Sequence, residues 1–589
     1  MNKRIICIIL AMLLLIPFVL TSCSQELTDD EIIDKIINSG STALTLSIWV
    51  PTEANVDDQN FKDRVDAVED AINAILRDKN YSTMIEIHAI SKDKYVEELN
   101  KKLDSAEQSV SKDFGGVLPS AYSQGYVNKA KKVPIGNSYM YELDYPAIIS
   151  SQLDIFYIGG YSNYLSYVNS GDAIKLNEYI NSGNKYGDIN KMISPKILEQ
   201  LSIGGGKYAI PNNHLYTKDT TYQYVLIDTE LLNAYKEQNN LDESFKLDSI
   251  LDCEDFINFV GENYEDVIPF VGSIDDAPGI LNFDDSSLIA GSVANGKPSS
   301  VFEIQSYNDY VTMLKRLNSS YVANGEIADD AKVAVSFFYG TNEELEALDG
   351  DYTVIKSETP VADKESIYES MFAISKYSID YDRAMKILYM LQSNEEIVTL
   401  LQYGIEGVDY EIVTDKKTGE QSVVRNENSA YDMTCAILGN SYYTYKLGEA
   451  PSYEWEDVKE INYDITVDPY MNFLDNYNEY ATDDEKEELA ALQAELSQYY
   501  ASILSQVENM TAEEYAEFIE LYLVDYSEVL ADIEELEAEE ELSEKEQAEL
   551  AELLEIKAAC EANALITEIN ASNFKKLVAL YQDLYYNYN

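Results

Sequence analysis

Short apolar runs alternate with longer amphipathic stretches along most of this chain. Residues 44–50 form an apolar run that ends at Pro51, residues 61–76 carry apolar side chains at helical spacing, and residues 84–90 alternate between apolar and polar side chains. These are the patterns of a strand, a helix and a second strand. In this order they predict two parallel strands with a helix packed across the sheet.

The same alternation continues further along the chain. Strands are predicted at residues 154–158, 208–211, 222–227, 332–338, 352–355 and 371–374, with helices starting at Thr229 and spanning residues 380–391. Strands that alternate with helices are typical of an α/β protein, and their distribution here predicts two α/β lobes.

The last part of the chain has a different character. Residues 481–589 contain 28 acidic and 5 basic side chains and neither proline nor glycine, so they predict an acidic helical region. A hydroxyl side chain is followed three residues later by glutamate at Thr482 and Glu485, Thr511 and Glu514, and Ser543 and Glu546. Each of these pairs predicts a capped helix start.

One apolar stripe runs through the middle of this region. Its residues follow one another at intervals of three or four: Tyr515, Phe518, Tyr522, Tyr526, Val529, Ile533 and Leu536. The spacing predicts one continuous helix with an inward apolar face and a solvated acidic face. A helix dedicated to binding a partner protein is the alternative.

Composition narrows the range of ligands. The 589 residues include 106 acidic and 42 basic side chains, which give a net charge of −64. This charge repels phosphate backbones and anionic headgroups, so it argues against nucleic acid and electrostatic membrane attachment and favours a neutral ligand. With 48 tyrosines against 16 phenylalanines and 2 tryptophans, much aromatic surface carries a hydroxyl that suits sugars, although packing accounts for most of these rings.

The N-terminus has the features of an export signal. Lys3 and Arg4 precede an apolar run at residues 5–20, which is shorter than the roughly 20 residues that a membrane-spanning helix needs. The run is followed by Leu20, Thr21, Ser22 and Cys23. We therefore interpret residues 1–22 as a signal peptide.

The end of the signal resembles the lipobox of bacterial lipoproteins. The resemblance implies that Cys23 becomes the first mature residue and carries the lipid, and that the protein faces the extracytoplasmic side of the cell membrane. The residues that follow Cys23 are mostly polar, so we interpret residues 23–43 as a lipid-anchored tether. Because the chain is so acidic, the anchor must be hydrophobic. An ordinary secretory signal with a coincidental cysteine is the alternative.

The sequence contains little that indicates catalysis or metal binding. Cys253, Cys435 and Cys560 are scattered and favour buried free thiols, with a bridge between the first two as the alternative. His88 and His214 are the only histidines, which excludes a histidine-rich zinc site. We expect no cofactor and no metal, and we expect that the protein is not an enzyme.

Several segments, taken in order after the lipobox-like sequence, resemble one family. They are residues 46–51, 154–157, 207–211, 371–376, 403–410 and 438–440. Their order and spacing resemble the family 1 extracellular solute-binding proteins of ABC importers, and residues 403–410 are similar to the YGIEGxxY segment of the carbohydrate-associated lipoproteins in that family. The resemblance covers residues 1 to about 475, whereas the longer and more acidic region from residue 481 departs from it.

The resemblance implies a two-lobed periplasmic-binding-protein-like α/β fold with a hinge, near residues 211–224 and 352–360. The implied boundaries are 44–212 with 361–410 for lobe 1, 213–360 with 411–475 for lobe 2, and 481–589 for the acidic helical C-terminal extension. The implied ligand is a sugar or oligosaccharide, which the protein delivers to ABC transporter permease subunits. A surface glycoside hydrolase, a peptide-binding importer component and a structural lipoprotein remain alternatives.

Ligand-binding candidates follow from the position of predicted strands. Clefts in this fold form at the carboxyl ends of parallel strands, where loops carry polar and aromatic groups. The candidates there are Trp49, Glu53, Tyr157, Gly159, Asn212, Asn213 and His214. The family-like segment adds Tyr403 and Glu406, and an aromatic-rich loop adds Trp455. Packing roles for Trp49 and Tyr157, and a capping or interlobe role for Glu406, are the alternatives.

Overall fold

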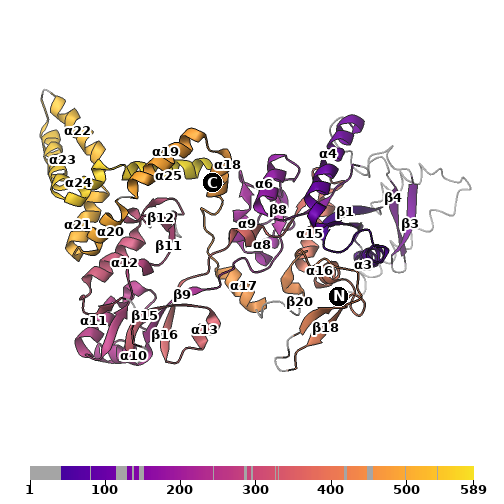
Figure 1. The fold of residues 1–589 in the computed structure, drawn as a ribbon, viewed down its shortest axis with the longest axis horizontal. Coiled ribbons are helices and arrows are strands. Elements are labelled where there is room, and N and C mark those ends of the chain that lie inside the picture. Colours follow the sequence, from indigo (N-terminus) through magenta and orange to yellow (C-terminus); the bar gives the residue numbers. More distant parts are fainter. Residues whose placement is uncertain are drawn as a thin grey trace, which may run out of the picture. The chain divides into compact units, whose positions relative to one another are not determined.

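The structure, a computed structural model, describes residues 42–588 with internal gaps. The gaps are residues 80, 115–128, 136–137, 145–150, 243, 284–287, 293–295, 325–326, 329–330, 417–418, 420, 448–454, 498 and 540. The chain divides into two compact units, each with its own sheet and helices (Figure 1). The predicted α/β class with a helical C-terminal region is therefore confirmed. The signal peptide, Cys23 and most of the tether lie outside the described residues.

The unit boundaries differ in part from the predicted lobes. Unit 1 comprises Met1–His214 and Tyr368–Ser452, and unit 2 comprises Leu215–Ile367 and Tyr453–Asn589. Residues 411–452, which the sequence prediction assigned to lobe 2, therefore lie in unit 1. The physical reason is a long-range contact: the buried Tyr431 hydroxyl donates to the carbonyl of Leu401 at 2.7 Å.

The sheet of unit 1 is built on β1 (Thr42–Thr52). It pairs in parallel with β2 (Thr83–Ser91) on one side and β5 (Ile155–Ile158) on the other. Helix α3 (Gln59–Asp78) connects β1 to β2, so the predicted strand–helix–strand unit is confirmed. Next to β5, β17 (Met371–Ile374) runs antiparallel.

The edges of this sheet come from other parts of the chain. β8 (Ala209–Pro211) pairs antiparallel with β17, and β3 (Lys129–Ile135) and β4 (Ser138–Asp144) form a hairpin whose second strand pairs with the first residues of β1. The change from parallel to antiparallel pairing falls between β5 and β17.

Helix α3 is fastened to the sheet by a buried amide. Asn73 Nδ2 donates to the carbonyl of Ile85 at 2.9 Å, and the Ile85 N–H donates to Asn73 Oδ1 at 2.8 Å. Asp58 caps the helix start by accepting from the N–H of Asn60. Apart from Asn73, the buried residues of α3 are apolar: Phe61, Val65, Val68, Ile72 and Leu76. The predicted amphipathic spacing is therefore confirmed.

The family-like segment folds around one ion pair in unit 1. Arg64 donates from Nε to Asp409 Oδ1 at 2.9 Å and from its terminal nitrogen to Oδ2 at 2.5 Å. Asp409 also accepts from the Ile405 N–H at 2.8 Å. Gly404 has a φ of +89°, and a Cβ there would lie 2.4 Å from Asp409 Oδ2, so glycine is required on both counts.

Unit 2 has a five-stranded mixed sheet. β9 (Tyr222–Asp228) pairs antiparallel with β15 (Lys332–Gly340) and β16 (Tyr352–Glu358), and β10 (Val267–Val271) runs parallel to β15. β14 (Val322–Ala323) forms the other edge. The strands predicted at residues 222–227, 332–338 and 352–355 are therefore confirmed.

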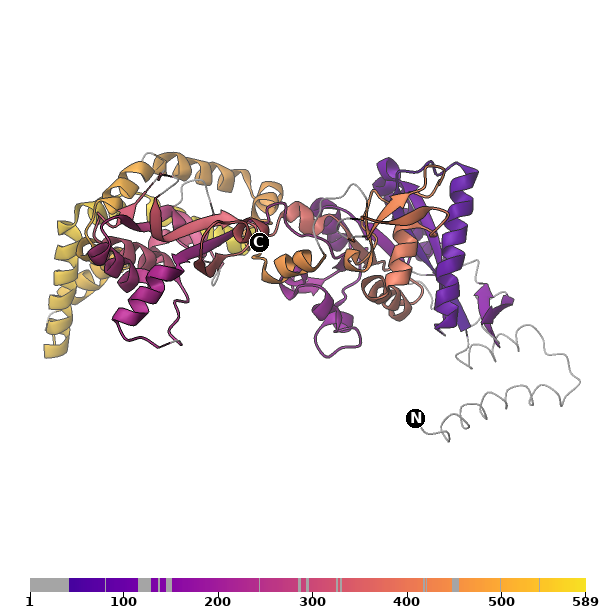
Figure 2. The ribbon, with the colours of Figure 1, turned by 90° about the horizontal axis from the view of Figure 1, so that it is seen from below.

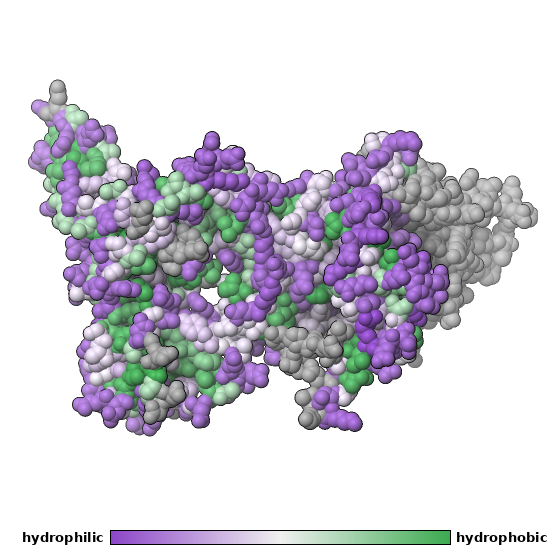
Figure 3. Space-filling view, viewed as in Figure 1, coloured by the Kyte–Doolittle hydropathy of each residue, from purple (hydrophilic) through white to green (hydrophobic). Residues whose placement is uncertain are grey.

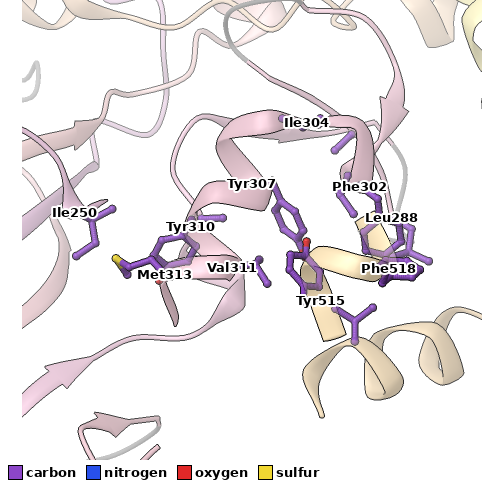
Figure 4. Packing of buried hydrophobic residues seen from close by; sticks show 14 of the residues in the cluster. Ile250, Leu288, Phe302, Ile304, Tyr307, Tyr310, Val311, Met313, Tyr515 and Phe518 are labelled. Carbon is purple, nitrogen blue, oxygen red and sulfur yellow. The ribbon is translucent and has the colours of Figure 1, made fainter. Parts of the chain in front are cut away.

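The C-terminal helices belong to the core of unit 2 (Figures 1 and 2). Phe518 and Tyr522 pack edge-on against Phe302, with ring centroids 5.1 and 5.3 Å apart, and the Tyr515 hydroxyl donates to Asn308 Oδ1 at 2.8 Å. Figure 4 shows Tyr515 beside Tyr307 of α12 (Gln305–Arg316), and Phe518 beside Leu288. The three predicted capping boxes at Thr482, Thr511 and Ser543 are all present.

The predicted continuous helix through residues 515–536 is wrong. The structure has two helices, α21 (Ala512–Tyr522) and α22 (Tyr526–Ala538), because Asp525 caps a new start by accepting from the N–H groups of Ser527 and Glu528. Lys575 satisfies the end of α21, since its Nζ donates to the carbonyls of Tyr522 and Val524 at 3.1 and 3.0 Å.

Helix α22 pairs with α23 (Glu544–Ala562), and the two lie side by side in both views (Figures 1 and 2). Val529 and Ile533 of α22 are buried, whereas Leu530 and Leu554 are partly exposed. Figure 3 shows apolar side chains flanked by hydrophilic ones where these two helices lie. Among the described helices, none is both long and apolar enough to cross a bilayer.

Glu69 gives unit 1 a pH-dependent stability. Burial raises its pKa to about 7, with the nearby Glu86 and Asp66 acting in the same direction, while the Ile87 N–H lowers it. A carboxyl group whose pKa is higher in the folded protein than in the unfolded chain adds to the free energy of unfolding at pH values below its unfolded pKa. This contribution is lost as the pH rises through the folded pKa. Glu69→Gln should therefore raise the melting temperature increasingly between pH 5 and pH 8, by thermal denaturation.

Asp78→Asn is the control, because it removes an exposed carboxylate at the end of the same helix. Its effect on melting temperature should be nearly constant across this pH range. A Glu69→Gln effect that is equally constant would contradict the burial argument.

Candidate functional site

Unit 1 contains a cavity of about 380 Å³ at the carboxyl ends of its parallel strands. Pro51 comes from the end of β1, Lys92 directly follows β2, and Gly159 directly follows β5. The cavity lies where strand order reverses around β1, which is where α/β sheets bind their ligands. Its lining consists of Pro51, Lys92, Tyr95, Val96, Tyr157, Ile158, Gly159, Asn163, Tyr167, Glu369, Thr434, Cys435, Ala436 and Ile437.

The hydroxyl of Tyr95 holds two strands together beneath this cavity. It accepts from the N–H of Tyr157 and lies 3.0 Å from the carbonyls of both Trp49 and Tyr157, to which it can donate. Tyr95 is the first residue of α4 (Tyr95–Phe114), and burial raises the pKa of its hydroxyl. The helix start, β1 and β5 are thereby fixed relative to one another.

Tyr157 and Gly159 shape one wall. The Tyr157 hydroxyl donates to the carbonyl of Glu369 at 2.8 Å, and burial raises the pKa of this hydroxyl. A Cβ on Gly159 would lie 3.1 Å from the Tyr157 ring and 3.2 Å from the Glu369 carbonyl. The absence of a side chain therefore lets β5 approach the segment before β17.

The polar groups around the cavity are paired with one another. Lys92 Nζ lies 3.3 Å from Glu53 Oε1, and Asn163 Nδ2 donates to the carbonyl of Gly159 at 2.7 Å. The partly exposed Cys435 has a free thiol whose pKa is raised by burial. The lining thus combines aromatic rings with amide, carboxylate and ammonium groups.

Two predicted residues contact the cavity lining from behind, and a third fastens a neighbouring helix. Asn212 is fully buried, and its Nδ2 donates to Ser370 Oγ at 2.9 Å and to the carbonyl of Ile437, a lining residue, at 2.7 Å. His214 Nε2 lies 3.5 Å from Glu369 Oε2. Asn213 Nδ2 donates to the carbonyl of Met192, so it fastens a neighbouring helix.

The other predicted residues lie elsewhere. Trp49 is half-buried with its ring against His88, at a centroid distance of 5.3 Å, and is not part of the lining. The Tyr403 hydroxyl donates to the Tyr445 carbonyl, Glu406 is exposed on the turn around Asp409, and Trp455 begins α17 (Trp455–Asp464) in unit 2. Ligand contact by these residues stays a prediction.

Sequence reasoning missed several lining residues. Lys92 and Tyr95 follow β2 as Glu53 follows β1, so the strand-end rule applied to β2 finds them. The segment 434–437 carries no such signal, because long-range contacts bring it there. Gln402 Nε2 donates to the carbonyls of Met433 and Ala436 at 3.1 and 2.9 Å.

No protein-family model matches the chain. It is 21% identical over 436 residues to a curated carbohydrate ABC transporter substrate-binding protein of Streptococcus pneumoniae serotype 4, covering 69% of this chain and 80% of that relative. The resemblance predicted from the sequence motifs is thereby confirmed.

Two solved structures are also similar. An N-glycan transport solute-binding protein from Streptococcus pneumoniae matches with a TM-score of 0.38 and 14% identity, covering 92% of this chain and 98% of that chain. A family 1 extracellular solute-binding protein from Alicyclobacillus acidocaldarius matches with a TM-score of 0.30 and 12% identity, covering 81% and 97%.

Tyr95→Phe tests the support of the cavity. The substitution removes the acceptor of the buried Tyr157 N–H and the donor to the two strand carbonyls, which should cost about 1 to 3 kcal/mol of unfolding free energy. Tyr381→Phe is the matched control, because its hydroxyl bonds one carbonyl on an exposed surface of the same unit. Equal losses of unfolding free energy in the two variants, measured by denaturant unfolding, would contradict a special role of Tyr95.

Proposed function

We propose that this protein is an extracytoplasmic solute-binding protein, anchored by a lipid on Cys23, that captures a sugar or oligosaccharide and delivers it to an ABC importer permease. The observation that carries the proposal is the tyrosine-lined cavity at the carboxyl ends of β1, β2 and β5. The curated relative, named as a carbohydrate ABC transporter substrate-binding protein, supports the same ligand class.

The chemistry of the cavity suits a sugar. A pyranose has an apolar C–H face and a rim of hydroxyls, so it needs aromatic or aliphatic contacts together with paired donors and acceptors. The apolar contacts come from Tyr95, Tyr157 and Pro51, and the polar donors and acceptors come from Asn163 and Glu369. The volume of about 380 Å³ falls within the range of roughly 300–1,000 Å³ for small-molecule sites.

Electrostatics favours a neutral ligand over an acidic one. The chain carries a net charge of −64, and Lys92 at the cavity is already paired with Glu53. An anionic sugar would therefore meet a repulsive field without an unpaired lysine in the lining to offset it. We expect thermal-shift screening to select neutral saccharides over uronic acids and peptides, because a ligand that binds the folded state raises its melting temperature.

Val96→Trp should block ligand binding while leaving the fold intact. Val96 lines the cavity and is 39% exposed, so an indole can enter the cavity without overpacking the core. Isothermal titration with the best saccharide from the screen should show at least about a tenfold loss of affinity, equivalent to about 1.4 kcal/mol.

Val413→Trp is the matched control, because Val413 is a similarly exposed valine on β18 (Tyr410–Thr414) that does not line the cavity. It should bind as the unchanged protein does. Unimpaired binding by Val96→Trp would place the ligand elsewhere, and recovery of a cleaved saccharide after prolonged incubation would contradict binding without turnover.

Cys23→Ser should release the protein from the membrane. The proposed lipid is the sole anchor, because the acidic surface does not attract anionic headgroups. Fractionation and metabolic labelling with a fatty acid report the result, with Cys7→Ser as the control within the signal peptide. Membrane retention of labelled Cys23→Ser would refute the anchor without bearing on sugar binding.

A further inference from the structure

A second pocket lies at the opposite end of β2 from the tyrosine-lined cavity. It has a volume of about 700 Å³ and is lined by Ser82 and Thr83, where β2 begins, and by the first turn of α15 (Tyr381–Ser393). β2 is 9 residues long, so the two pockets are separated by about 30 Å along the strand. A ligand in one pocket does not touch the other.

This second pocket gathers three cations in a very acidic protein. Lys185, Arg383 and Lys386 all line it, together with the carboxylates of Asp380 and Asp382. The local balance is therefore positive, whereas the chain as a whole has 106 acidic and 42 basic residues. This local excess of positive charge requires an explanation, because like charges gathered in one pocket destabilise the fold.

Two of the three cations have carboxylate partners. Arg383 Nε lies 3.3 Å from Asp380 Oδ2, and this guanidinium also donates to the carbonyl of Ser82. Lys185 Nζ lies 3.7 Å from Asp382 Oδ2. These contacts neutralise both lining carboxylates and leave Lys386 as the excess positive charge.

Lys386 is held in place without an ion pair. Its Nζ lies 3.4 Å from the centroid of the Tyr81 ring, and no carboxylate in the described part of the chain forms a salt bridge with it. Burial lowers the pKa of Lys386, and the neighbouring Lys185 and Arg383 lower it further. The ring therefore orients an ammonium group whose charge is not neutralised by the protein.

We propose that this pocket binds a small oxyanion, such as phosphate or a phosphate ester, through Lys386 with the help of Lys185. A bound oxyanion supplies the missing negative charge and accepts hydrogen bonds from both ammonium groups. A small anion is favoured over an anionic membrane because of the size of each ligand relative to the range of the electrostatic field. At physiological ionic strength fields extend only about 8 Å, so a small ion responds to the local positive charge, whereas a lipid surface meets the whole acidic protein.

The test is titration of the full mature protein with inorganic phosphate at constant ionic strength. Thermal shift and isothermal titration should show saturable binding in the millimolar range, and Lys386→Gln should weaken it at least about fivefold. Lys62→Gln, which removes an exposed lysine from α3 of the same unit, should bind phosphate as the unchanged protein does. Saccharide affinity should be the same in all three proteins.

Two kinds of result would overturn the proposed anion site. A phosphate response that is absent, or equal in Lys386→Gln and Lys62→Gln, would mean a general salt effect and no site. Co-sedimentation with phosphatidylglycerol vesicles that depends on Lys386 would overturn the choice of a small anion. Loss of saccharide binding with intact phosphate binding would affect only the proposed transport function.

Discussion

The buried carboxyl group of Asp154 joins the segments from which unit 1 is built. It accepts from the N–H of Ser47 in β1 at 2.9 Å, from Ser378 Oγ at 2.7 Å and from the N–H of Ile379 at 2.9 Å. Burial raises its pKa, whereas the hydrogen bonds from Ser378 and Ser47 lower it. A fully buried carboxyl group is tolerated only with such partners. These partners are separated by more than 300 residues, so this one side chain ties the returning segment to β1. Tyr95 joins β1 and β5 a second time, at Trp49 and Tyr157, so the strands that border the cavity are fixed to each other at two levels.

The C-terminal helices carry a large negative charge and still pack into the core of unit 2 through their aromatic side chains. Their carboxylates face outward, while Tyr515, Phe518 and Tyr522 are at most 2% exposed and pack against the segment of Phe302. Few lysines are present in this region, and Lys575 bonds backbone carbonyls at the end of α21 in place of a carboxylate. Lys315 does the same for α20 (Tyr500–Glu508), with its Nζ 2.6 Å from the carbonyl of Val507. The carboxyl end of a helix carries partial negative charge, so the ammonium groups of these two lysines stabilise the ends of α21 and α20. The C-terminal helices are therefore part of unit 2, although their composition differs from that of the rest of the chain.

The sequence was most informative where structure is local. Periodicity predicted α3 and both of its flanking strands, and hydroxyl–glutamate pairs predicted three helix starts, because these features depend on neighbours a few residues away. Apolar spacing does not predict the break between α21 and α22, because the spacing continues through it and only the cap at Asp525 marks a new helix start. At the cavity, Tyr157 and Gly159 were predicted from the end of one strand. Thr434 and Cys435 were not, because Gln402 and Asn212 bring that segment to the sheet over long sequence separations.

The motif that carried the family resemblance most clearly has a structural role in unit 1. Gly404 makes room for Asp409, and Asp409 anchors the turn to Arg64 of α3. Glu406 is exposed to solvent. None of these residues lines the tyrosine-lined cavity, whose polar groups come from segments outside the motif. A shared turn of this kind preserves the way in which helix and sheet pack, and it places no constraint on Lys92, Asn163 or Glu369. Resemblance at this motif therefore predicts the fold, whereas the identity of the ligand depends on side chains that the motif does not contain.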